Sequence, residues 1–354
     1  MKKNSPQEHL LIIRLSAMGD VAMVVPVLML LRQKYPKLKI TVLSKAFFKP
    51  IFNDIPDIHF HFADVKGKHK GILGLYKLSK ELNQLGVTKI ADLHSVLRSN
   101  VLCWFLNWKR INIKKVDKGR KEKKALTRPQ NKIFKQLKTT HQRYADVFSQ
   151  LNFPIDVSNS VFLPKKEINP KIHNLIGADT KKWIGIAPFA AHKGKMYPLD
   201  LMEEVIQKLD KTNQFKIIIF GGGNKEKQQV NAVLKNHKNT VNTIEKLTFE
   251  EELALISNLD IMVSMDSGNA HLAAMYGIKA ITLWGVTHPY AGFCPIGQPK
   301  EYALLSDREK YPLIPTSVYG NKLPDDYKEI MRTITPEQVI EKILEGIEQH
   351  YTSS

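Results

Sequence analysis

The stretch 261–285, IMVSMDSGNAHLAAMYGIKAITLWG, holds the residues of this chain that are best arranged to bind an anion. Its apolar ends predict two buried strands, and between them a tight turn at 266–268 leads into a helix of small residues. The first amides of a helix lack intrahelical acceptors, and the helix dipole adds positive potential there. With His271 about one turn inside the helix, the turn suits a phosphate or diphosphate group. The structural alternative is an ordinary turn in which Asp266 caps the helix.

A carboxylate follows the first apolar run of the chain, Leu10–Leu15, in the sequence Ser16-Ala17-Met18-Gly19-Asp20. Asp20 lies where a helix is predicted to begin, so its simplest role is that of a helix cap. The functional alternative is a general base, because a carboxylate at the end of a buried strand can accept a proton from a substrate hydroxyl.

Three further strand ends carry polar groups. Asp92, His94 and Arg98 follow a predicted strand at 87–91, and Arg98 is suited to clamp an anion or to remain solvated. Lysines 193 and 195 follow the strand at 183–187, where a lysine can neutralise a diphosphate or simply lie on the surface. Glycines 221–223 follow the strand at 215–220 and permit a ligand to approach the backbone closely.

Several common nucleotide-binding and hydrolase patterns are missing from the sequence. A dinucleotide fingerprint starting at Gly221 would need glycine at position 226, which is Glu226, and the first strand is followed by a single glycine, Gly19. A Walker A sequence and a nucleophile elbow with a Ser-His-Asp order are also missing. The sequence therefore disfavours an NAD-dependent enzyme and gives no indication of a P-loop NTPase or a serine hydrolase.

Alternating strands and helices must position these residues. The strands are short, apolar and rich in β-branched residues, as expected of parallel strands that are covered on both faces. The predicted strands are Leu10–Leu15, Ile40–Leu43, Ile58–Phe62, Val87–Ala91, Trp183–Ala187, Phe215–Phe220, Thr240–Ile244, Ile261–Met265 and Ala280–Trp284. The predicted helices are 21–34, 47–52, 72–85, 96–105, a helix near 140–151, 199–209, 225–236, 249–258 and 336–349.

This order predicts an α/β protein with two doubly wound, Rossmann-like units joined by a linker at about 154–180. A chain of 354 residues, of which 43% are hydrophobic, is long enough for two domains. We expect an N-terminal domain at 1–165, a C-terminal domain at 166–335 and a final helix within 336–354. Because ligands of open α/β sheets bind beyond the carboxyl ends of the strands, we expect the polar residues above to face a central cleft.

The charge of the chain predicts an anionic partner. The formal net charge is +19, and residues 109–143 contribute +12 of it, with 14 Lys or Arg and two acids. That segment is too polar for a core and is expected to be a mobile surface loop. The two cysteines, Cys103 and Cys294, fit a reduced cytoplasmic protein. The sequence shows no signal-peptide pattern and no apolar run long enough to span a bilayer.

Four blocks of this sequence, in order, resemble the family-nine glycosyltransferases, the ADP-heptose:lipopolysaccharide heptosyltransferases. The blocks are Ile13–Val21, Asp92-Leu93-His94 with Arg98, Lys195–Pro198 and Met265–Leu272, and the ending Met331–Val339 is also similar. The resemblance covers nearly the whole chain. It implies a GT-B fold in which the N-terminal domain binds the acceptor, the C-terminal domain binds the nucleotide sugar, and the last helix returns to the N-terminal domain.

The resemblance also implies roles for individual residues. Asp20 would be the catalytic base of an inverting transfer that needs no metal and no cofactor. The donor-binding residues would be Lys195, Asp266, Ser267, Gly268, Asn269, His271, Gly222 and Glu226, and the acceptor-binding residues Ser16, Met18, Gly19, His94 and Arg98. Two departures bear on the donor. Phe189-Ala190-Ala191 stands where the family often has a hydroxyl residue, and the glycines at 221–223 stand where it often has an acid that holds the ribose.

The expected function is therefore transfer of a heptose from ADP-heptose to the Kdo/heptose inner core of lipopolysaccharide. The expected partners are that donor, a lipid A–Kdo or heptosylated core acceptor, and the anionic inner-membrane surface, to which the basic segment would draw a cytoplasmic, peripherally associated enzyme. A family-nine-like transferase or another enzyme that uses a different nucleotide sugar is the alternative. A nucleic-acid-binding protein is a more remote one, because the basic segment lacks interleaved aromatics and the chain lacks a nucleic-acid-binding motif.

Overall fold

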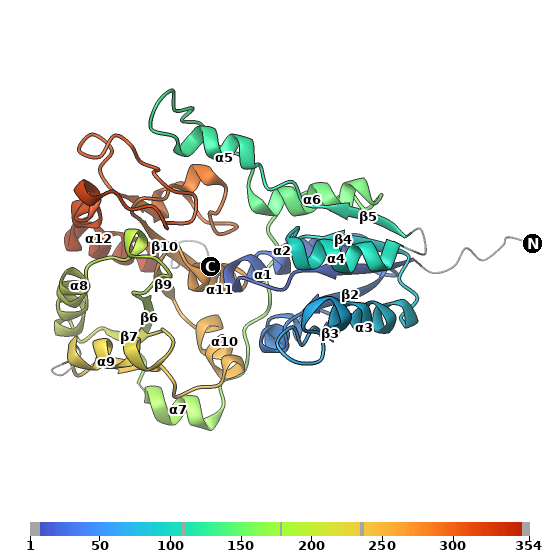
Figure 1. Ribbon diagram of the computed structural model, residues 1–354. Coiled ribbons are helices and arrows are strands. Elements are labelled where there is room, and N and C mark those ends of the chain that lie inside the picture. The colour runs from blue at the N-terminus through green and yellow to red at the C-terminus, as the bar shows by residue number, and fades with distance from the viewer. Residues whose placement is uncertain (1–7, 108–110, 178, 234–236, 349–354) are drawn as a thin grey trace, which may run out of the picture. The chain divides into compact units, whose positions relative to one another are not determined.

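Two parallel sheets organise the chain in the computed structural model, which describes residues 8–107, 111–177, 179–233 and 237–348 (Figure 1). The chain divides into two units. Unit 1 comprises Met1–Lys118 and Thr140–Leu163, and unit 2 comprises Gly119–Thr139 and Pro164–Ser354. Parts of the predicted basic segment, linker and helices fall on residues 109–110, 178, 234–236 and 349, which lie outside the described residues.

Unit 1 is built on a five-stranded sheet with the strand order β3-β2-β1-β4-β5, in which every neighbouring pair is parallel. The strands are β1 (His9–Ile13), β2 (Lys39–Ser44), β3 (Ile58–Phe62), β4 (Lys89–Asp92) and β5 (Asn112–Lys115). Strand β1 is buried along its whole length, as its apolar sequence predicts for a central strand. Strand β5, with the sequence NIKK, is an edge strand that the prediction did not include.

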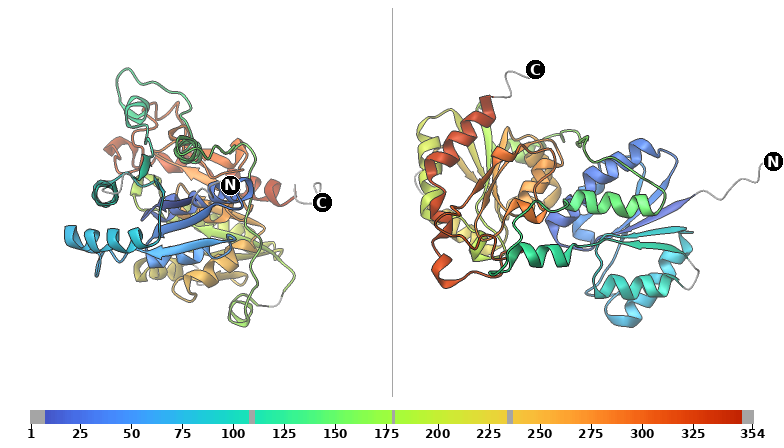
Figure 2. Two further views of the ribbon diagram at one scale, coloured as in Figure 1. Left: turned by 90° about the vertical axis from the view of Figure 1, so that its right-hand side faces the viewer. Right: turned by 90° about the horizontal axis from the view of Figure 1, so that it is seen from above.

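Helices cover both faces of this sheet. They are α1 (Met18–Ala22), α2 (Val24–Lys34), the 3-10 helix η1 (Ala46–Phe52), α3 (Gly71–Gln84), α4 (Leu97–Leu106) and α6 (Thr140–Gln150). Helices α3 and α4 pack together on one face, and α2 and α6 pack together on the other (Figures 1 and 2). The helix predicted over 21–34 is two helices, because the backbone interrupts the α-helix at Met23.

Unit 2 repeats the same winding with one additional strand. Its six strands follow the order β11-β10-β9-β6-β7-β8 and are all parallel. They are β6 (Lys182–Ala187), β7 (Phe215–Ile219), β8 (Thr240–Asn242), β9 (Ile261–Met265), β10 (Lys279–Trp284) and β11 (Ala303–Leu305). In both units the first and fourth strands of the winding lie side by side at the centre of the sheet.

The helices of unit 2 are mostly amphipathic elements between these strands. They are α5 (Arg120–Thr127), α7 (Pro170–Ile176), α8 (Leu199–Lys211), α9 (Asn224–Val233), α10 (Phe249–Ser257), α11 (Gly268–Ala274) and α12 (Pro336–Glu348), with 3-10 turns at Lys193–Lys195, Pro289–Ala291, Lys300–Tyr302, Asp325–Tyr327 and Ile330–Thr333. The last helix, α12, belongs to unit 2, and its return to the N-terminal domain stays a prediction. It packs on α8, β9 and β10, because its apolar side chains Val339, Ile343 and Ile347 belong to the core of unit 2.

The basic segment is ordered around a small apolar cluster rather than forming a loop throughout. Leu126, Leu137 and Ala291 form that cluster, with Phe134, Tyr290 and Phe293 packed against it. The ammonium group of Lys132 donates hydrogen bonds to the carbonyls of Leu126, Leu313 and Pro315 at 3.2, 2.8 and 2.7 Å. These contacts make residues 119–139 part of unit 2, whereas the predicted boundary at 165 left them with the first domain. No helix among the described residues is long and apolar enough to cross a lipid bilayer.

Candidate active site

All the sequence-predicted site residues except Gly222 and Glu226 follow the two central strands of each sheet. In unit 1, Ser16–Asp20 follows β1 and His94–Arg98 follows β4, and β1 and β4 are hydrogen-bonded neighbours. In unit 2, Lys195 follows β6 and the turn 266–271 follows β9, and these two strands also pair. In each sheet the chain turns in opposite directions after these two strands, which is the place where open α/β sheets bind ligands.

An arginine just beyond the end of β1 holds the carboxylate of Asp20. Arg14 is buried, and its Nη2 forms an ion pair with Asp20 Oδ2. The same oxygen accepts a hydrogen bond from the backbone N–H of Ala17 at 3.3 Å. Arg14 Nη1 donates to the Leu93 carbonyl at 2.6 Å, so the guanidinium also ties the end of β1 to the end of β4. Asp20 thus has a fixed position beyond the carboxyl end of the central strand β1. The sequence analysis assigned Arg14 no role.

His94 lies next to this carboxylate on the neighbouring strand end. Burial lowers the pKa of His94 to about 4, and the positive charges of Arg14 and Lys118 act in the same direction. The imidazole is therefore neutral at physiological pH. Its Nε2 is 3.4 Å from the hydroxyl oxygen of Ser16, and its buried Nδ1 has no hydrogen-bond partner among the residues that the structure describes. A neutral imidazole with a vacant nitrogen can bind a substrate hydroxyl.

Asp92 supports the backbone of this strand end. Its buried carboxylate accepts hydrogen bonds from the backbone N–H groups of His94 and Ser95 at 3.0 and 2.8 Å and from the Ser99 hydroxyl at 2.9 Å. These bonds fix the turn that carries His94 into α4. Arg98, in the first turn of α4, is exposed.

The first turn of α1 carries the other two predicted acceptor residues. Met18 and Gly19 are the first two residues of that helix and are partly exposed. They lie in the sequence between the end of β1 and Asp20. Ser16, Met18, Gly19 and Asp20 thus follow β1, while His94 follows the neighbouring β4 and lies 3.4 Å from Ser16.

In unit 2, loops after two neighbouring strands bring Lys195 and Asp266 together. The ammonium group of Lys195 lies 3.0 Å from Asp266 Oδ2, and both side chains are largely buried. Asp266 directly follows β9 and does not serve as the N-cap of α11, a position occupied by Ser267. The structural alternative of a capping aspartate is therefore wrong. A lysine and a carboxylate placed here can bind a diphosphate and a sugar hydroxyl, respectively.

Three glycines shape the place where Lys195 lies. Gly320 has φ +85°, and a Cβ there would be 2.3 Å from Lys195 Cδ, so the aliphatic stem of the lysine lies against bare backbone. The carbonyl of Gly194 accepts a hydrogen bond from the Val286 N–H at 2.9 Å, and a Cβ on Gly285 would be 2.2 Å from that carbonyl oxygen. Sequence reasoning left 286–330 without a role, and the structure uses part of that stretch to position Lys195.

The turn between β9 and α11 offers further groups to a ligand. The hydroxyl of Ser267 is 2.9 Å from that of Ser264, and α11 begins at Gly268. The Oδ1 atom of Asn269 is buried and has no hydrogen-bond partner among the described residues, which leaves it able to bind a ligand donor. His271 is buried within α11. All five predicted residues of this turn lie within one short segment of unit 2.

The predicted donor residues after β7 form a separate loop at the end of a neighbouring strand. The backbone N–H of Gly222 donates to Glu226 Oε2 at 2.8 Å, so this carboxylate stabilises the loop that it follows. Apart from Gly222 itself and its two chain neighbours, no described residue has an atom within 4 Å of a Cβ built on Gly222, which leaves open space beside the backbone. Among the described residues, no group of three or more His, Cys, Asp or Glu side chains could hold a metal ion.

Solved structures with the same architecture identify the class of the fold. The glycosyl transferase family 9 protein of Veillonella parvula is 19% identical, with a TM-score of 0.75, over 98% of this chain and 99% of that one. The E. coli ADP-heptose lps heptosyltransferase II is 16% identical, with a TM-score of 0.69, over 97% and 99% of the two chains. Two doubly wound sheets of this form are the GT-B fold of glycosyltransferases, as the sequence predicted.

The family is established by sequence similarity. The model of Glycosyltransferase family 9 (heptosyltransferase) matches residues 75–317, and the chain belongs to this family. It is 25% identical to the lipopolysaccharide core heptosyltransferase OpsX of Haemophilus influenzae, over 80% of each chain. It is 24% identical to the lipopolysaccharide heptosyltransferase 1 of Campylobacter coli, over 79% of this chain and 84% of that one. The prediction of a family-nine glycosyltransferase is confirmed.

Proposed function

We propose that this glycosyltransferase moves a heptose from ADP-heptose to the inner core of lipopolysaccharide, with inversion at the anomeric carbon and without a metal. The names of its relatives in Haemophilus influenzae and Campylobacter coli support heptose as the sugar and lipopolysaccharide as the acceptor class. The name of the similar E. coli ADP-heptose lps heptosyltransferase II supports the donor. The observation that carries the proposal is the pair of charged sites at the central strand ends. One holds a carboxylate beside an arginine, and the other a lysine beside a carboxylate.

Asp20 serves as the general base in this proposal. Both contacts of its carboxylate with the described residues use Oδ2, so Oδ1 can accept a hydrogen bond from an acceptor hydroxyl. As that oxygen attacks the anomeric carbon, its proton passes to Asp20 and the bond from the sugar to the diphosphate breaks. Ser16, Met18, Gly19, His94 and Arg98 bind the acceptor. The neutral His94 binds a hydroxyl without competing for the proton.

Unit 2 binds the donor and its leaving group. Negative charge grows on the diphosphate as ADP leaves, and a preorganised lysine stabilises that charge without reorientation at the moment of reaction. Lys195 supplies the positive charge, while Ser267, Gly268, Asn269 and His271 offer hydrogen-bonding groups. Asp266 keeps Lys195 in place in the absence of donor and then binds a sugar hydroxyl. Gly222 and Glu226 contact the nucleoside.

If the acceptor lies in a membrane, the basic segment can bring the protein to it by electrostatic attraction. Lys132 is engaged by three carbonyls, and the ammonium group of Lys123 lies 4.1 Å from the centre of the Phe293 ring, so these two lysines support unit 2. The exposed Lys121, Lys124 and Lys135 are placed to attract the protein to an anionic membrane surface. Each basic residue near such a surface contributes about 1 kcal/mol, which salt weakens.

Thermal stabilisation by nucleotides tests the donor. The purified protein is heated with ADP, ADP-heptose, UDP, GDP or NAD, each with and without magnesium. We expect ADP and ADP-heptose to raise the melting temperature, since a ligand at about 100 times its Kd stabilises by roughly 2.7 kcal/mol. Transfer of heptose to a lipid A–Kdo acceptor then tests the reaction. Stabilisation by UDP or GDP alone would replace the proposed donor with another nucleotide sugar.

A different donor is the second candidate, and one observation favours including it. The carboxylate of Glu226 accepts a hydrogen bond from the loop of Gly222 rather than lying apart from it. A ribose would have to compete for this acid, so the nucleotide preference depends on how that loop responds to the ligand. The five-nucleotide comparison decides between the two candidates directly.

A further inference from the structure

Helices α3 and α4 expose an apolar surface that the reaction at the strand ends does not use. We call it the α3–α4 face. It consists of Ile72, Leu73 and Tyr76 on α3 and of Leu97, Trp104 and Phe105 on α4. Leu97 is 81% exposed, Leu73 78% and Trp104 71%. Large apolar side chains gathered in this way on a protein surface mark an interaction site.

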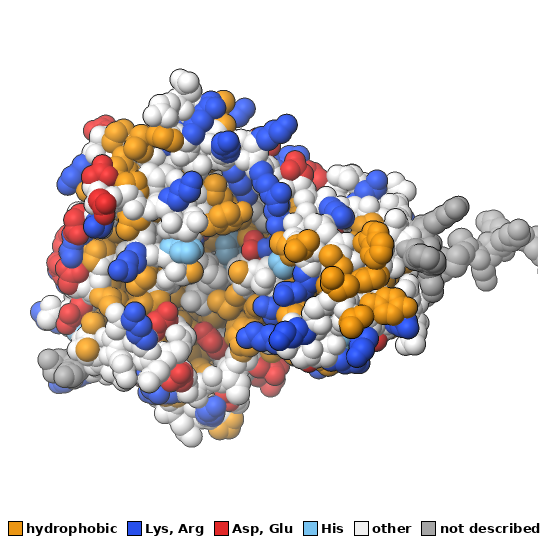
Figure 3. Space-filling model, viewed as in Figure 1, with side chains coloured by type: hydrophobic (Ala, Val, Ile, Leu, Met, Phe, Trp, Pro, Cys, Tyr) orange, Lys and Arg blue, Asp and Glu red, His pale blue; other side chains and the backbone are white. Residues whose placement is uncertain are grey.

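The members of this face are close together in space. The rings of Tyr76 and Phe105 are 5.4 Å apart, and those of Phe105 and Trp104 are 5.0 Å apart, which links the two helices through three aromatic residues. Leu97 lies two turns before Trp104 on the same side of α4. Figure 3 shows hydrophobic side chains gathered over α3 and α4 with Lys and Arg side chains beside them.

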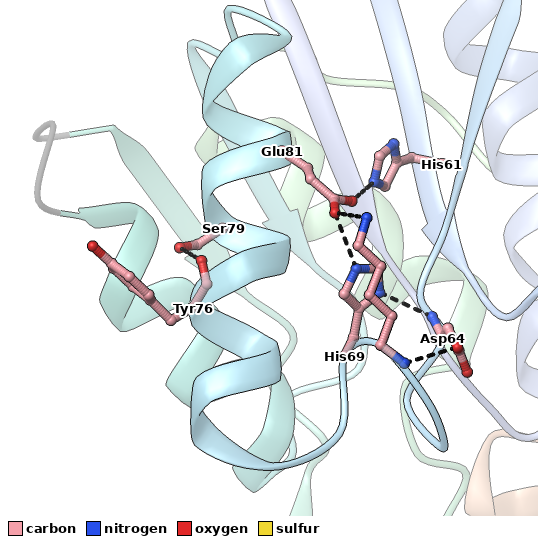
Figure 4. A network of polar contacts seen from close by, with 7 residues as sticks. His61, Asp64, His69, Tyr76, Ser79 and Glu81 are labelled. Carbon is pink, nitrogen blue, oxygen red and sulfur yellow. Dashed lines mark hydrogen bonds and ion pairs between the residues drawn. The ribbon is translucent and has the colours of Figure 1, made fainter.

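A network of polar contacts fixes the opposite side of α3. Glu81 accepts hydrogen bonds from His61 at 3.2 Å and from His69 at 3.3 Å and pairs with Lys68 (Figure 4). Although burial opposes it, the hydrogen bonds from Lys68 and His69 lower the pKa of Glu81 to about 2. Figure 4 shows Tyr76 on the side of α3 away from Glu81. The exposed apolar residues therefore belong to a well-anchored helix.

The charges around this face are positive. Helices α3 and α4 carry Lys77, Lys80 and Arg98, all exposed, and Glu81 is the single acid in their sequences. The ammonium group of Lys80 lies 4.5 Å from the centre of the Tyr76 ring, and Lys115 of β5 donates to Asn100 of α4 at 2.9 Å. The charge of Glu81 is compensated by Lys68 and by hydrogen bonds from His61 and His69. The α3–α4 face therefore presents apolar side chains surrounded by a cationic rim, which consists of Lys77, Lys80 and Arg98.

We propose that the α3–α4 face docks unit 1 on an anionic lipid bilayer, with Leu73, Leu97 and Trp104 entering the interfacial region. Trp and Tyr favour that region because their rings are apolar and their N–H or O–H groups stay hydrated. Lysine side chains extend their charges to the headgroups while their stems cover apolar surface. A partner protein would not require a cationic rim, whereas an anionic bilayer complements it.

This docking surface deepens the membrane attraction proposed above and rests on that part of the proposed function, and its vesicle assay contains no sugar nucleotide or acceptor. The full-length protein is mixed with vesicles of phosphatidylcholine with one quarter phosphatidylglycerol, or of phosphatidylcholine alone, and bound protein is separated by flotation. The test variant is Leu73→Ser with Trp104→Ser. The matched control is Phe162→Ser with Leu344→Ser, an aromatic and an aliphatic side chain exposed elsewhere, at 38% each. Melting temperature and ADP binding are measured separately for every variant.

We expect the wild type and the control to bind the anionic vesicles and the test variant to bind at least about tenfold more weakly, because two apolar side chains no longer enter the interface. Lys77→Glu with Lys80→Glu should weaken binding to the anionic vesicles without abolishing it, because the exposed Lys121, Lys124 and Lys135 still attract the protein. An unchanged affinity of the Leu73/Trp104 variant, or no binding by the wild type, would overturn the proposal. So would a wild-type dimer that the test variant dissociates, since the face would then be a self-interface.

The readouts keep this proposal apart from the proposed function. A variant that loses vesicle binding but keeps its melting temperature and its ADP binding locates the defect on the docking surface. Loss of ADP preference in the wild type with intact vesicle binding would instead refute the donor and leave the docking surface standing.

Discussion

The two units share a strand order but hold their charged groups differently. In unit 1, Asp20 is paired with an arginine from its own strand end, and its side chain remains 27% exposed. In unit 2, Lys195 and Asp266 come from loops after neighbouring strands, and their side chains are 13% and 9% exposed. The first arrangement leaves a carboxylate that a substrate can reach. The arrangement in unit 2 shields an ion pair, and an anionic ligand must displace Asp266 to reach Lys195. The two units are therefore suited to bind different ligands.

Unit 1 also exposes more large hydrophobic side chains than unit 2 does. Eight of the twelve large hydrophobic side chains exposed among the described residues belong to unit 1, although it is the smaller unit. They are Phe47, Phe62, Ile72, Leu73, Tyr76, Leu97, Trp104 and Phe162. Unit 2 covers more of its apolar surface, in part with residues 119–139. Unit 1 therefore combines an accessible carboxylate with an accessible apolar face.

Asp20→Asn tests whether the accessible carboxylate of unit 1 is the catalytic base. We expect transfer to fall by about 10³-fold, because general-base catalysis typically contributes 10²–10⁴-fold and the amide cannot take the proton. ADP affinity and melting temperature should stay near those of the wild type, since the donor site belongs to unit 2. Steady-state transfer and calorimetric ADP binding provide the measurement. Near-normal turnover would exclude Asp20 as the base, and lost ADP affinity would erase the distinction between the units.

Lys195→Met tests the role of the buried lysine in the proposed donor site of unit 2. The variant removes the positive charge that faces the leaving group and leaves Asp266 without its lysine, so we expect kcat to fall about a hundredfold and ADP to bind more weakly. Lys193→Met is the matched control, because this lysine is exposed in the same loop. Equal losses in both variants would mean that general positive charge, rather than the placement of Lys195, matters.

Gly285→Ala tests the rigidity of the loop that carries Lys195 without altering a charged group. A Cβ at this position would be 2.2 Å from the Gly194 carbonyl oxygen, so the loop that carries Lys195 must shift. We expect a loss of about 1–3 kcal/mol in the free energy of unfolding and roughly tenfold weaker ADP binding. Gly222→Ala, which has open space at its Cβ, should keep the wild-type melting temperature. An unperturbed Gly285→Ala protein would contradict the proposed rigidity of this loop.

The pH dependence of stability can be compared for one buried histidine from each unit, His94 and His288. Burial lowers the pKa of His94 and of His288 to about 4, with Arg14 and Arg308, respectively, adding to the shift. The unfolded chain, with ordinary histidine pKa values near 6.5, binds more protons between about pH 4 and 6.5. The contribution of these two histidines to stability is therefore greatest above about pH 6.5 and falls as the pH decreases through that window, by about 1–2 kcal/mol per histidine at pH 5.

Denaturant unfolding at pH 7.5 and pH 5 measures this effect. His94→Gln and His288→Gln should each reduce the pH dependence of the free energy of unfolding. A His94→Gln protein with the full wild-type pH dependence would mean that this histidine does not contribute to the loss of stability.

Most of the fold could be predicted because its central strands are buried on both faces. The continuous apolar run Ile261–Met265 has the same bounds in the structure as in the prediction, and so does the more exposed strand Ile58–Phe62. Strand β5 was missed because an edge strand needs no apolar alternation, and lysines are common there. Helix α5 was missed because its buried positions, Lys123 and Leu126, give only one apolar residue to detect.

Some residues of the candidate site could be predicted from the local sequence, and others could not. Strand ends rich in polar residues identified Asp20, Lys195 and Asp266, since the residues at the end of a strand are apparent from the local sequence. Arg14 and Gly320 could not be found in this way, because their roles depend on contacts between distant segments. Arg14 reaches Leu93 at the end of the neighbouring strand, and Gly320 provides the bare backbone against the stem of Lys195.

The assignment of residues 119–139 to unit 2 has a consequence for synthesis on the ribosome. The segment leaves the ribosome between two parts of unit 1, while Leu313 and Pro315, which Lys132 contacts, follow it by 181 and 183 residues. At about 5–20 residues per second, it waits roughly 10 to 40 seconds for them. Its eight Lys or Arg residues and single acid keep this nascent segment hydrated and mutually repelling during the delay. The chain can thus complete the sheet of unit 1 while residues 119–139 remain solvated until the rest of unit 2 has been synthesised.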